Sequence, residues 1–372
     1  MNPTNESFPL PVLPGLSALA ELREANPVRV ALDVEGDSFY RYGERLCLVQ
    51  VAYADRVRVH DPGAEDLEPF FRDLEDRALV LHGADFDLRL LHARYRFDPK
   101  NVFDTMLAAR FLNLPKFGLS DLYEKYFGIV LEKKHQRADW CRRPLSEELL
   151  AYARMDVERL EELGEILGAE LDALGRRAWH AEECRAVVIR TIRGAAKPPD
   201  PDAWRVKGSG ALGRKELAYL RELAAARDRI ARETDRALFR VFSAEDLIVL
   251  ARSAAADPAT ALRRFPRALP GALLRELQSA IQNANVSSPE DWPALPAPGR
   301  RPDPSLERQV VQLSKKKEEV AATLNLDPGF LVSKTAVARV AAGRPTTLAE
   351  LEVILESRWR AAVLQDAFLD AP

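Results

Sequence analysis

The sequence contains little cysteine and no cysteine motif. Its 372 residues include only Cys47, Cys141 and Cys184, which are far apart and form no C-x-x-C pair. Cysteines used in this way are typical of proteins from a reducing compartment. We therefore predict reduced, mostly buried thiols in a cytoplasmic protein.

Signals for secretion or membrane insertion are also missing. The first sixteen residues lack a basic segment followed by a continuous apolar one, so we expect no signal peptide. No apolar run is long enough to cross a bilayer. The sequence therefore predicts neither a secretory signal peptide nor a membrane-spanning helix.

A large charge excess is absent too. The 54 basic and 57 acidic side chains give a formal net charge of −3. Binding to a polyanion must therefore depend on local basic patches. Gly208, Gly213 and Lys215 superficially resemble a phosphate-binding loop, but Arg214 interrupts the motif and no serine or threonine follows.

Regular hydrophobic patterns dominate what is present. Period-two or apolar runs predict strands at residues 28–35, 46–53, 56–60, 78–82 and 102–103. Helical spacing follows at residues 16–25, 67–76, 85–95, 105–112, 121–127 and after Pro144, with 160–192 continuing as helix. Strands in a meander, followed by strands alternating with helices, predict a mixed α/β sheet flanked by helices.

The strand at residues 28–35 carries two acids on one face. Asp33 and Glu35 are two positions apart, so their side chains project from the same side. Two carboxylates at that spacing repel each other unless a cation lies between them, which suggests a metal site. For this pair alone, the solvated face of an edge strand remains the simpler interpretation.

Further acids occur on helices that could pack beside this strand. Asp87 lies in the first turn of the helix predicted at 85–95 and could approach Asp33 and Glu35, whereas Asp85 fits an N-cap position. In the helix after Pro144, with Ser146 as its expected N-cap, Tyr152 and Asp156 are four residues apart and share a face.

Together these residues resemble the tyrosine-bearing branch of the DEDD exonucleases. The segments LHGADFDLRLL, FDTMLAARFL and KKHQRADWCRRPLSEELLAYARMDVERL resemble the ribonuclease D family more narrowly. The resemblance implies a ribonuclease H-like α/β nuclease domain. It also implies a catalytic set of Asp33, Glu35, Asp87, Tyr152 and Asp156.

The resemblance further implies the chemistry. The four carboxylates would hold two divalent cations, Mg²⁺ or Mn²⁺, and Tyr152 would orient the attacking water. The implied activity is 3′–5′ exoribonuclease: trimming the 3′ ends of transfer RNA precursors and other small RNAs with release of nucleoside 5′-monophosphates. A basic cluster before the last motif could contact the RNA backbone; it comprises Lys133, Lys134, His135, Arg137, Arg142 and Arg143. Gln50 lies on the strand beside the site and is a weaker candidate for contact with substrate.

The rest of the chain reads as two helical modules separated by Pro-rich linkers. We expect domains at residues 1–197, 211–284 and 305–372. The two modules look like distant copies, because Ile230-Ala231 aligns with Val320-Ala321 and Ser243 with Ser333, 90 positions later, without a gap. The first copy, and more weakly the second, resembles the HRDC domain, which implies a helical module that helps bind nucleic acid.

Three alternatives remain open from the sequence. The same carboxylates occur in DNA-directed 3′–5′ exonucleases. The chain could also be a non-catalytic nucleic-acid-binding scaffold, although the intact set of five site residues disfavours this. A helicase-associated fragment is disfavoured by the missing phosphate-binding loop.

Overall fold

The computed structural model describes residues 15–132, 134–195, 200–263, 271–295 and 303–369. The contacts of the chain divide it into two compact units. The larger unit comprises residues 1–36, 46–196 and 302–372. The smaller unit comprises residues 37–45 and 197–301.

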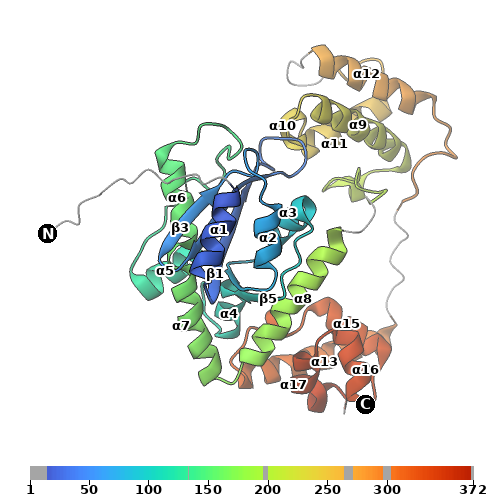
Figure 1. The fold of residues 1–372 in the computed structure, drawn as a ribbon. Coiled ribbons are helices and arrows are strands. Elements are labelled where there is room, and N and C mark those ends of the chain that lie inside the picture. The colour runs from blue at the N-terminus through green and yellow to red at the C-terminus, as the bar shows by residue number, and fades with distance from the viewer. Residues whose placement is uncertain (1–14, 133, 196–199, 264–270, 296–302, 370–372) are drawn as a thin grey trace. The chain divides into compact units, whose positions relative to one another are not determined.

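A five-stranded mixed sheet forms the centre of the larger unit (Figure 1). Its strands are β1 (Arg29–Gly36), β2 (Leu46–Tyr53), β3 (Arg56–His60), β4 (Ala78–Leu81) and β5 (Asn101–Asp104), in the order β3-β2-β1-β4-β5. The β1–β2 and β2–β3 pairs are antiparallel, whereas β1–β4 and β4–β5 are parallel. The predicted mixed α/β sheet is confirmed.

Side chains along β1 alternate between the two faces of the sheet, and each face packs against its own layer of helices. Val30, Leu32 and Val34 pack with α1 (Gly15–Ala25), α2 (Glu68–Leu74) and α3 (Asp85–Tyr95). Ala31 packs on the other face with α4 (Thr105–Phe111), α5 (Leu119–Phe127), α6 (Glu147–Glu158) and α7 (Leu160–Ala173). Asp33 and Glu35 share the face of Ala31 and therefore project toward the α6 and α7 side.

Several local predictions need correction. The helix expected to continue from residue 160 to 192 is two helices, α7 and α8 (Arg177–Ala195), because Gly175 adopts a left-handed conformation with φ 66° that ends the first. Asp85 is not an N-cap, since α3 begins with it and Ala84 precedes it. Ser146 does cap α6, accepting a hydrogen bond from Leu149 N.

The expectation of three reduced cysteines is wrong. Cys47 on β2 and Cys141 in the segment before α6 form a disulfide, with their Cα atoms 5.0 Å apart. Cys184 on α8 is buried and free. The two paired cysteines are 94 positions apart, so no local motif could reveal that β2 and the segment before α6 are neighbours.

The two C-terminal helical modules repeat the same element order. The first contains α9 (Arg214–Glu233), α10 (Leu238–Val241) and α11 (Ala244–Ala256); the second contains α13 (Pro304–Thr323), α14 (Pro328–Leu331) and α15 (Lys334–Gly343). Each begins 90 positions after its counterpart, as for α9 and α13 (304 − 214 = 90). Ser243 and Ser333 cap α11 and α15 in the same way. The aligned copies predicted from the sequence are confirmed as a structural repeat.

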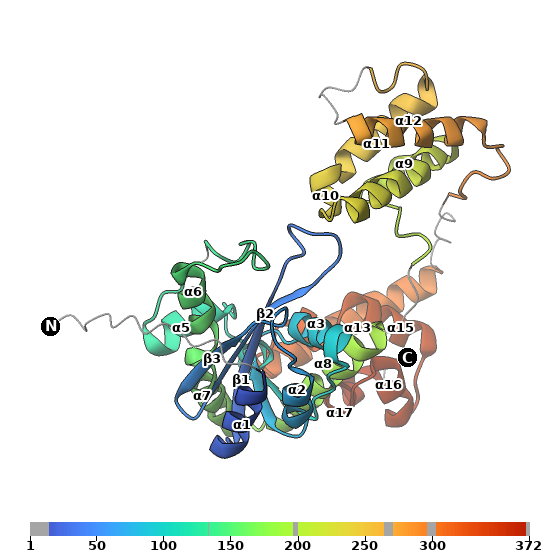
Figure 2. The ribbon, with the colours of Figure 1, turned by 45° about the horizontal axis from the view of Figure 1, so that its top comes forward.

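The two copies have different surroundings. In the smaller unit the first copy, completed by α12 (Gly271–Val286), packs with the loop 37–45, where the Tyr42 hydroxyl donates to Asp228 at 2.8 Å. In the larger unit the second copy, completed by α16 (Leu348–Leu355) and α17 (Arg358–Phe368), lies against α8 (Figures 1 and 2). Residues 302–372 belong to the same compact unit as the sheet. The predicted domain boundaries 1–197, 211–284 and 305–372 remain a prediction.

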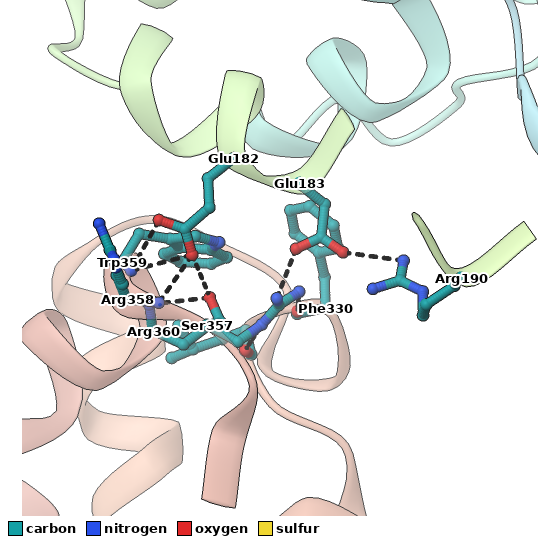
Figure 3. Close-up of polar contacts among 9 residues, drawn as sticks. Glu182, Glu183, Arg190, Phe330, Ser357, Arg358, Trp359 and Arg360 are labelled. Carbon is teal, nitrogen blue, oxygen red and sulfur yellow. Dashed lines mark hydrogen bonds and ion pairs between the residues drawn. The ribbon is translucent and has the colours of Figure 1, made fainter. Parts of the chain in front are cut away.

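Apolar and polar contacts join this second copy to the rest of the larger unit. Trp359 stacks on Trp179 with ring centroids 5.3 Å apart, and Phe330 packs edge-on against Phe111 at 4.8 Å. Glu182 on α8 accepts hydrogen bonds from the Ser357 hydroxyl and from backbone N–H groups at the start of α17 (Figure 3). A carboxylate at a helix N-terminus satisfies N–H groups that have no partner within the helix.

Candidate active site

Asp33 and Glu35 lie near the carboxyl end of β1. In the antiparallel β1–β2 ladder, Asp33 is directly opposite Gln50 and Glu35 is opposite Leu48. Both acids are partly buried, while the alternating residues Leu32 and Val34 are buried in the opposite core layer. The strand therefore fixes two carboxylates on one face, as the sequence predicted.

Asp87 reaches this strand from the first turn of α3. The parallel β1–β4 pairing covers Arg29 to Ala31, so it ends before Val34. The Val34 N–H donates instead to Asp87 Oδ1 at 3.1 Å. Asp87 is 3% exposed, whereas Asp85 two positions earlier is on the surface. The structure thus separates the two acids that the sequence left close to each other.

Helix α6 supplies Asp156 and Tyr152. Carboxylate oxygens of Asp33, Glu35 and Asp156 all lie within 4.8 Å of one another. Tyr152, one turn before Asp156, packs against Trp140 and His135 with ring centroids 5.9 and 5.7 Å away. All five residues predicted for the site are therefore held by β1, α3 and α6 around the end of one strand.

The four carboxylates strongly influence one another's ionisation. Burial raises the pKa of Asp33 to about 7, although the Val34 N–H acts in the opposite direction. Burial, followed by the charge of Asp33, raises the pKa of Asp156 to about 8. Burial, and then the same charge, raises the pKa of Glu35 and of Asp87 well above the ordinary range. Such a cluster favours either bound protons or bound cations.

The chemistry of these donors fits a divalent metal. None of the four acids forms an ion pair with a basic side chain among the described residues. Carboxylate oxygens are hard ligands of the kind that Mg²⁺ and Mn²⁺ prefer. Asp33, Glu35 and Asp156 could hold one ion together, and Asp87 extends the set on the α3 side.

The Tyr152 phenol stays protonated in these surroundings. Burial raises its pKa further above its ordinary value, and the charges of Asp156, Glu35 and Asp33 add to the effect. A phenol of this kind can donate or accept a hydrogen bond, but it is a poor source of phenolate at neutral pH. The geometry therefore suits orientation of a water molecule better than removal of its proton.

Asp104 positions the turn that carries Asp87. Its carboxylate caps α4 by accepting from Met106 N and Leu107 N, and it also accepts from Gly83 N and Ala84 N at 3.0 and 2.9 Å. Gly83 has φ 73°, and a Cβ there would lie 2.2 Å from Met106 Cε. Sequence reasoning missed this support, although an aspartate directly before a helix is a recognisable N-cap signal.

Gln50 lies next to the carboxylates with its amide unpaired. The residue is fully buried, and neither its amide nitrogen nor its carbonyl oxygen has a hydrogen-bond partner among the described residues. Its pairing with Asp33 places both side chains on the same face of the sheet. Buried amides are usually hydrogen-bonded, so this one is available to a group that binds at the site.

The basic cluster before α6 has mixed roles. Arg143 is used within the protein, donating to Asp61 at 2.5 Å and to the carbonyls of Trp140 and Cys47. Its predicted contact with phosphate is therefore unsupported. Lys134 and Arg142 are exposed, and His135 packs on Tyr152. Lys133 lies outside the described residues.

Comparison with known proteins gives the class first. Residues 15–172 match a family model described as 3′-5′ exonuclease, and this segment contains the whole sheet and all five site residues. The chain is 30% identical over 379 aligned positions to ribonuclease D of Granulibacter bethesdensis, covering 97% of this chain and 92% of that protein. It is 33% identical over 242 residues to ribonuclease D of Escherichia coli, covering 64% of each.

Solved structures agree with this assignment. A protein from Bifidobacterium adolescentis, 25% identical, aligns with a TM-score of 0.85 over 98% of this chain and 97% of its own. Escherichia coli RNase D, described as an exoribonuclease involved in structured RNA processing, shares the fold with a TM-score of 0.71 at 24% identity, over 96% of this chain and 99% of its own. The chain belongs to the ribonuclease D family, and it is a 3′–5′ exoribonuclease.

This assignment agrees with the resemblance drawn from the sequence. It disfavours both the DNA-directed and the non-catalytic alternatives. The HRDC likeness of the helical modules remains a prediction. Among the helices of the described residues, none combines the length and apolar character needed to span a bilayer.

Proposed function

We propose that this exoribonuclease trims the 3′ ends of transfer RNA precursors and other small RNAs, releasing nucleoside 5′-monophosphates. Asp33, Glu35, Asp87 and Asp156 would hold two divalent cations, Mg²⁺ or Mn²⁺. The observation that supports this best is the convergence of four mutually repelling carboxylates, without a basic partner among the described residues, at the end of β1.

Each part of the site has a role in this proposal. When bound, the cations would supply Lewis-acid stabilisation of the phosphodiester and of the leaving 3′-oxygen. Tyr152 orients the attacking water through its hydroxyl, since its raised pKa keeps the phenol protonated. Asp104 holds the turn at Gly83 and Ala84, which keeps Asp87 in register with β1. Cytoplasmic location remains part of the proposal.

The direct test is incubation of the full chain with a 3′-extended transfer RNA and Mg²⁺. We expect stepwise shortening from the 3′ end, release of 5′-monophosphates, and no reaction when the 3′-hydroxyl is blocked. Cleavage of the blocked RNA would contradict the exonucleolytic direction. Faster degradation of a matched DNA strand would favour the DNA-directed alternative instead.

A further inference from the structure

A groove of about 780 Å³ lies within the larger unit. Residues from α3, α4 and α8 line it on the nuclease side. Residues from α14 and α15, including Phe330 and Arg339, line it on the side of the C-terminal repeat. The groove therefore exists only because residues 302–372 pack on the nuclease core.

Five helices each contribute one arginine to this groove: Arg89 from α3, Arg110 from α4, Arg190 from α8, Arg339 from α15 and Arg360 from α17. The guanidinium of Arg110 lies over the Phe330 ring at 4.3 Å, and no carboxylate pairs with it among the described residues. A guanidinium held flat on an aromatic ring keeps its N–H donors at its edge, where a phosphate can accept them.

The two buried acids in the groove already have partners within the protein. Glu183, 6% exposed, forms ion pairs with both Arg360 and Arg190 (Figure 3). The Asp104 carboxylate accepts hydrogen bonds from the four backbone N–H groups described above. Two exposed acids remain at the groove, Asp85 and Glu356, and Glu356 pairs with Arg339 at 3.2 Å. The five arginines of the groove therefore outnumber its four acids by one, and Arg110 has no carboxylate partner among the described residues.

The groove also lies at the same edge of the sheet as the carboxylates. Strands β1, β4 and β5 are parallel, so their carboxyl ends meet at one edge. Asp33 and Glu35 lie near the carboxyl end of β1. Of the residues that line the groove, Gly83 follows β4 and Asp104 ends β5. Two interstrand spacings, about 10 Å, separate β1 from β5. Asp85, which lines the groove, is two positions before Asp87.

We infer that this groove binds the single-stranded part of the RNA substrate upstream of the 3′-terminal nucleotides that occupy the active site. The inference rests on the proposed function, because it assumes that an RNA 3′ end lies at the carboxylates. The arginines bind backbone phosphates and Arg110 on Phe330 is the central anchor. Contacts to phosphate hold the strand without selecting its sequence.

The test compares a 12-nucleotide oligoadenylate, which is long enough to reach the groove, with a dinucleotide that is too short. The full-length chain carries Arg110→Gln together with Arg190→Gln. Binding of the 12-mer is measured by fluorescence anisotropy in Ca²⁺, and dinucleotide hydrolysis is measured in Mg²⁺. Arg358→Gln is the matched control, because this exposed arginine belongs to the same C-terminal repeat but does not line the groove.

We expect the double variant to bind the 12-mer about tenfold or more weakly. The slope of log affinity against log salt should flatten by roughly 1.4, about 0.7 for each lost phosphate contact. Dinucleotide hydrolysis and the melting temperature should stay close to those of the wild-type chain and of Arg358→Gln. If the double variant does not fold, Arg190→Gln with Arg339→Gln replaces it, since both side chains are at least half exposed.

Unchanged 12-mer affinity and salt slope in a folded variant would overturn the inference and leave the groove to another partner, such as a protein. That result is distinct from failure of the proposed function, in which the wild-type chain itself would not shorten RNA from its 3′ end.

Discussion

At the scale of single residues, the site consists of acids that destabilise one another until a cation binds. In the metal-free chain the folded state raises the pKa of Asp33 from 3.8 to about 7. Between these values the folded state holds a proton that the unfolded state has lost. Stability must therefore fall as pH rises through this interval.

The corresponding variant is Asp33→Asn. Without metal at pH 8 we expect a higher melting temperature than for the wild-type chain, because a buried charge is removed, and a weaker pH dependence between pH 4 and 7. With Mg²⁺ the wild type should regain stability, while the variant loses more than about 100-fold in activity. Asp76→Asn, at an exposed surface ion pair, is the control. Full activity of Asp33→Asn in excess chelator would exclude the proposed metal site.

Tyr152→Phe keeps the ring and its packing on Trp140 but removes the hydroxyl. We expect kcat to fall on the order of 10²–10⁴-fold, with KM nearly unchanged, since the hydroxyl acts on the water rather than on substrate binding. Tyr126→Phe removes a hydroxyl that bonds to Glu170 and should leave kcat unchanged. A Tyr152→Phe enzyme that runs within a few fold of wild type would limit Tyr152 to packing.

Gln50→Met should change stability and activity in opposite directions. Replacing a buried, unpaired amide with an apolar side chain of similar size should stabilise the fold by about 1 kcal/mol, which is measurable as a higher melting temperature. If the amide binds substrate or its water, kcat/KM should fall about tenfold. A lower melting temperature would show that the amide is hydrogen-bonded in solution, for example to water.

At the scale of elements, the two helical copies offer a paired experiment. Ser243 and Ser333 cap equivalent helices, and replacing either with alanine should cost about 1 kcal/mol locally. Because the copies belong to different compact units, each substitution should lower the stability of its own unit.

We expect Ser333→Ala to lower the temperature at which nuclease activity is lost. Ser243→Ala should instead lower the unfolding temperature of the smaller unit, measured by hydrogen exchange of α9 and α11. Equal loss of thermal activity in both variants would show that the chain unfolds as a single cooperative block.

At the scale of the whole molecule, the C-terminal repeat is part of the nuclease unit. Trp359 is 3% exposed and stacks on Trp179 of α8. Trp359→Ala should cost about 3–5 kcal/mol and lower the melting temperature of the nuclease by roughly 10 °C. Val353→Ala, in the same repeat but 76% exposed, should leave the melting temperature unchanged. A Trp359→Ala chain that melts at the wild-type temperature would show that the repeat does not support the core.

The sequence predicted the local pattern well and the long-range contacts poorly. Strand periodicity placed Asp33 and Glu35 on one face, helix spacing paired Tyr152 with Asp156, and the family segments identified Asp87. These signals are local in the chain. The offset of 90 positions between the helical copies was likewise readable, because a repeat keeps its own internal spacing.

What remained hidden depends on partners distant in sequence. The Cys47–Cys141 pair, the four hydrogen bonds of Asp104 and the helix cap by Glu182 each require knowing which segments meet in three dimensions. The ion pair of Arg143 was hidden for the same reason, since its partner Asp61 lies 82 positions away. Positive charge alone could not distinguish an internal clamp from an RNA contact.

The disulfide also gives the chain an unusual covalent topology. It closes a ring from Cys47 to Cys141, with one tail before it and one after it. Asp33 and Glu35 belong to the first tail, Asp87 to the ring, and Tyr152 and Asp156 to the second tail. A single backbone cut anywhere within the ring would therefore leave all five residues on one covalently connected molecule, whereas the same cut in the reduced chain would separate the first two acids from the last two site residues.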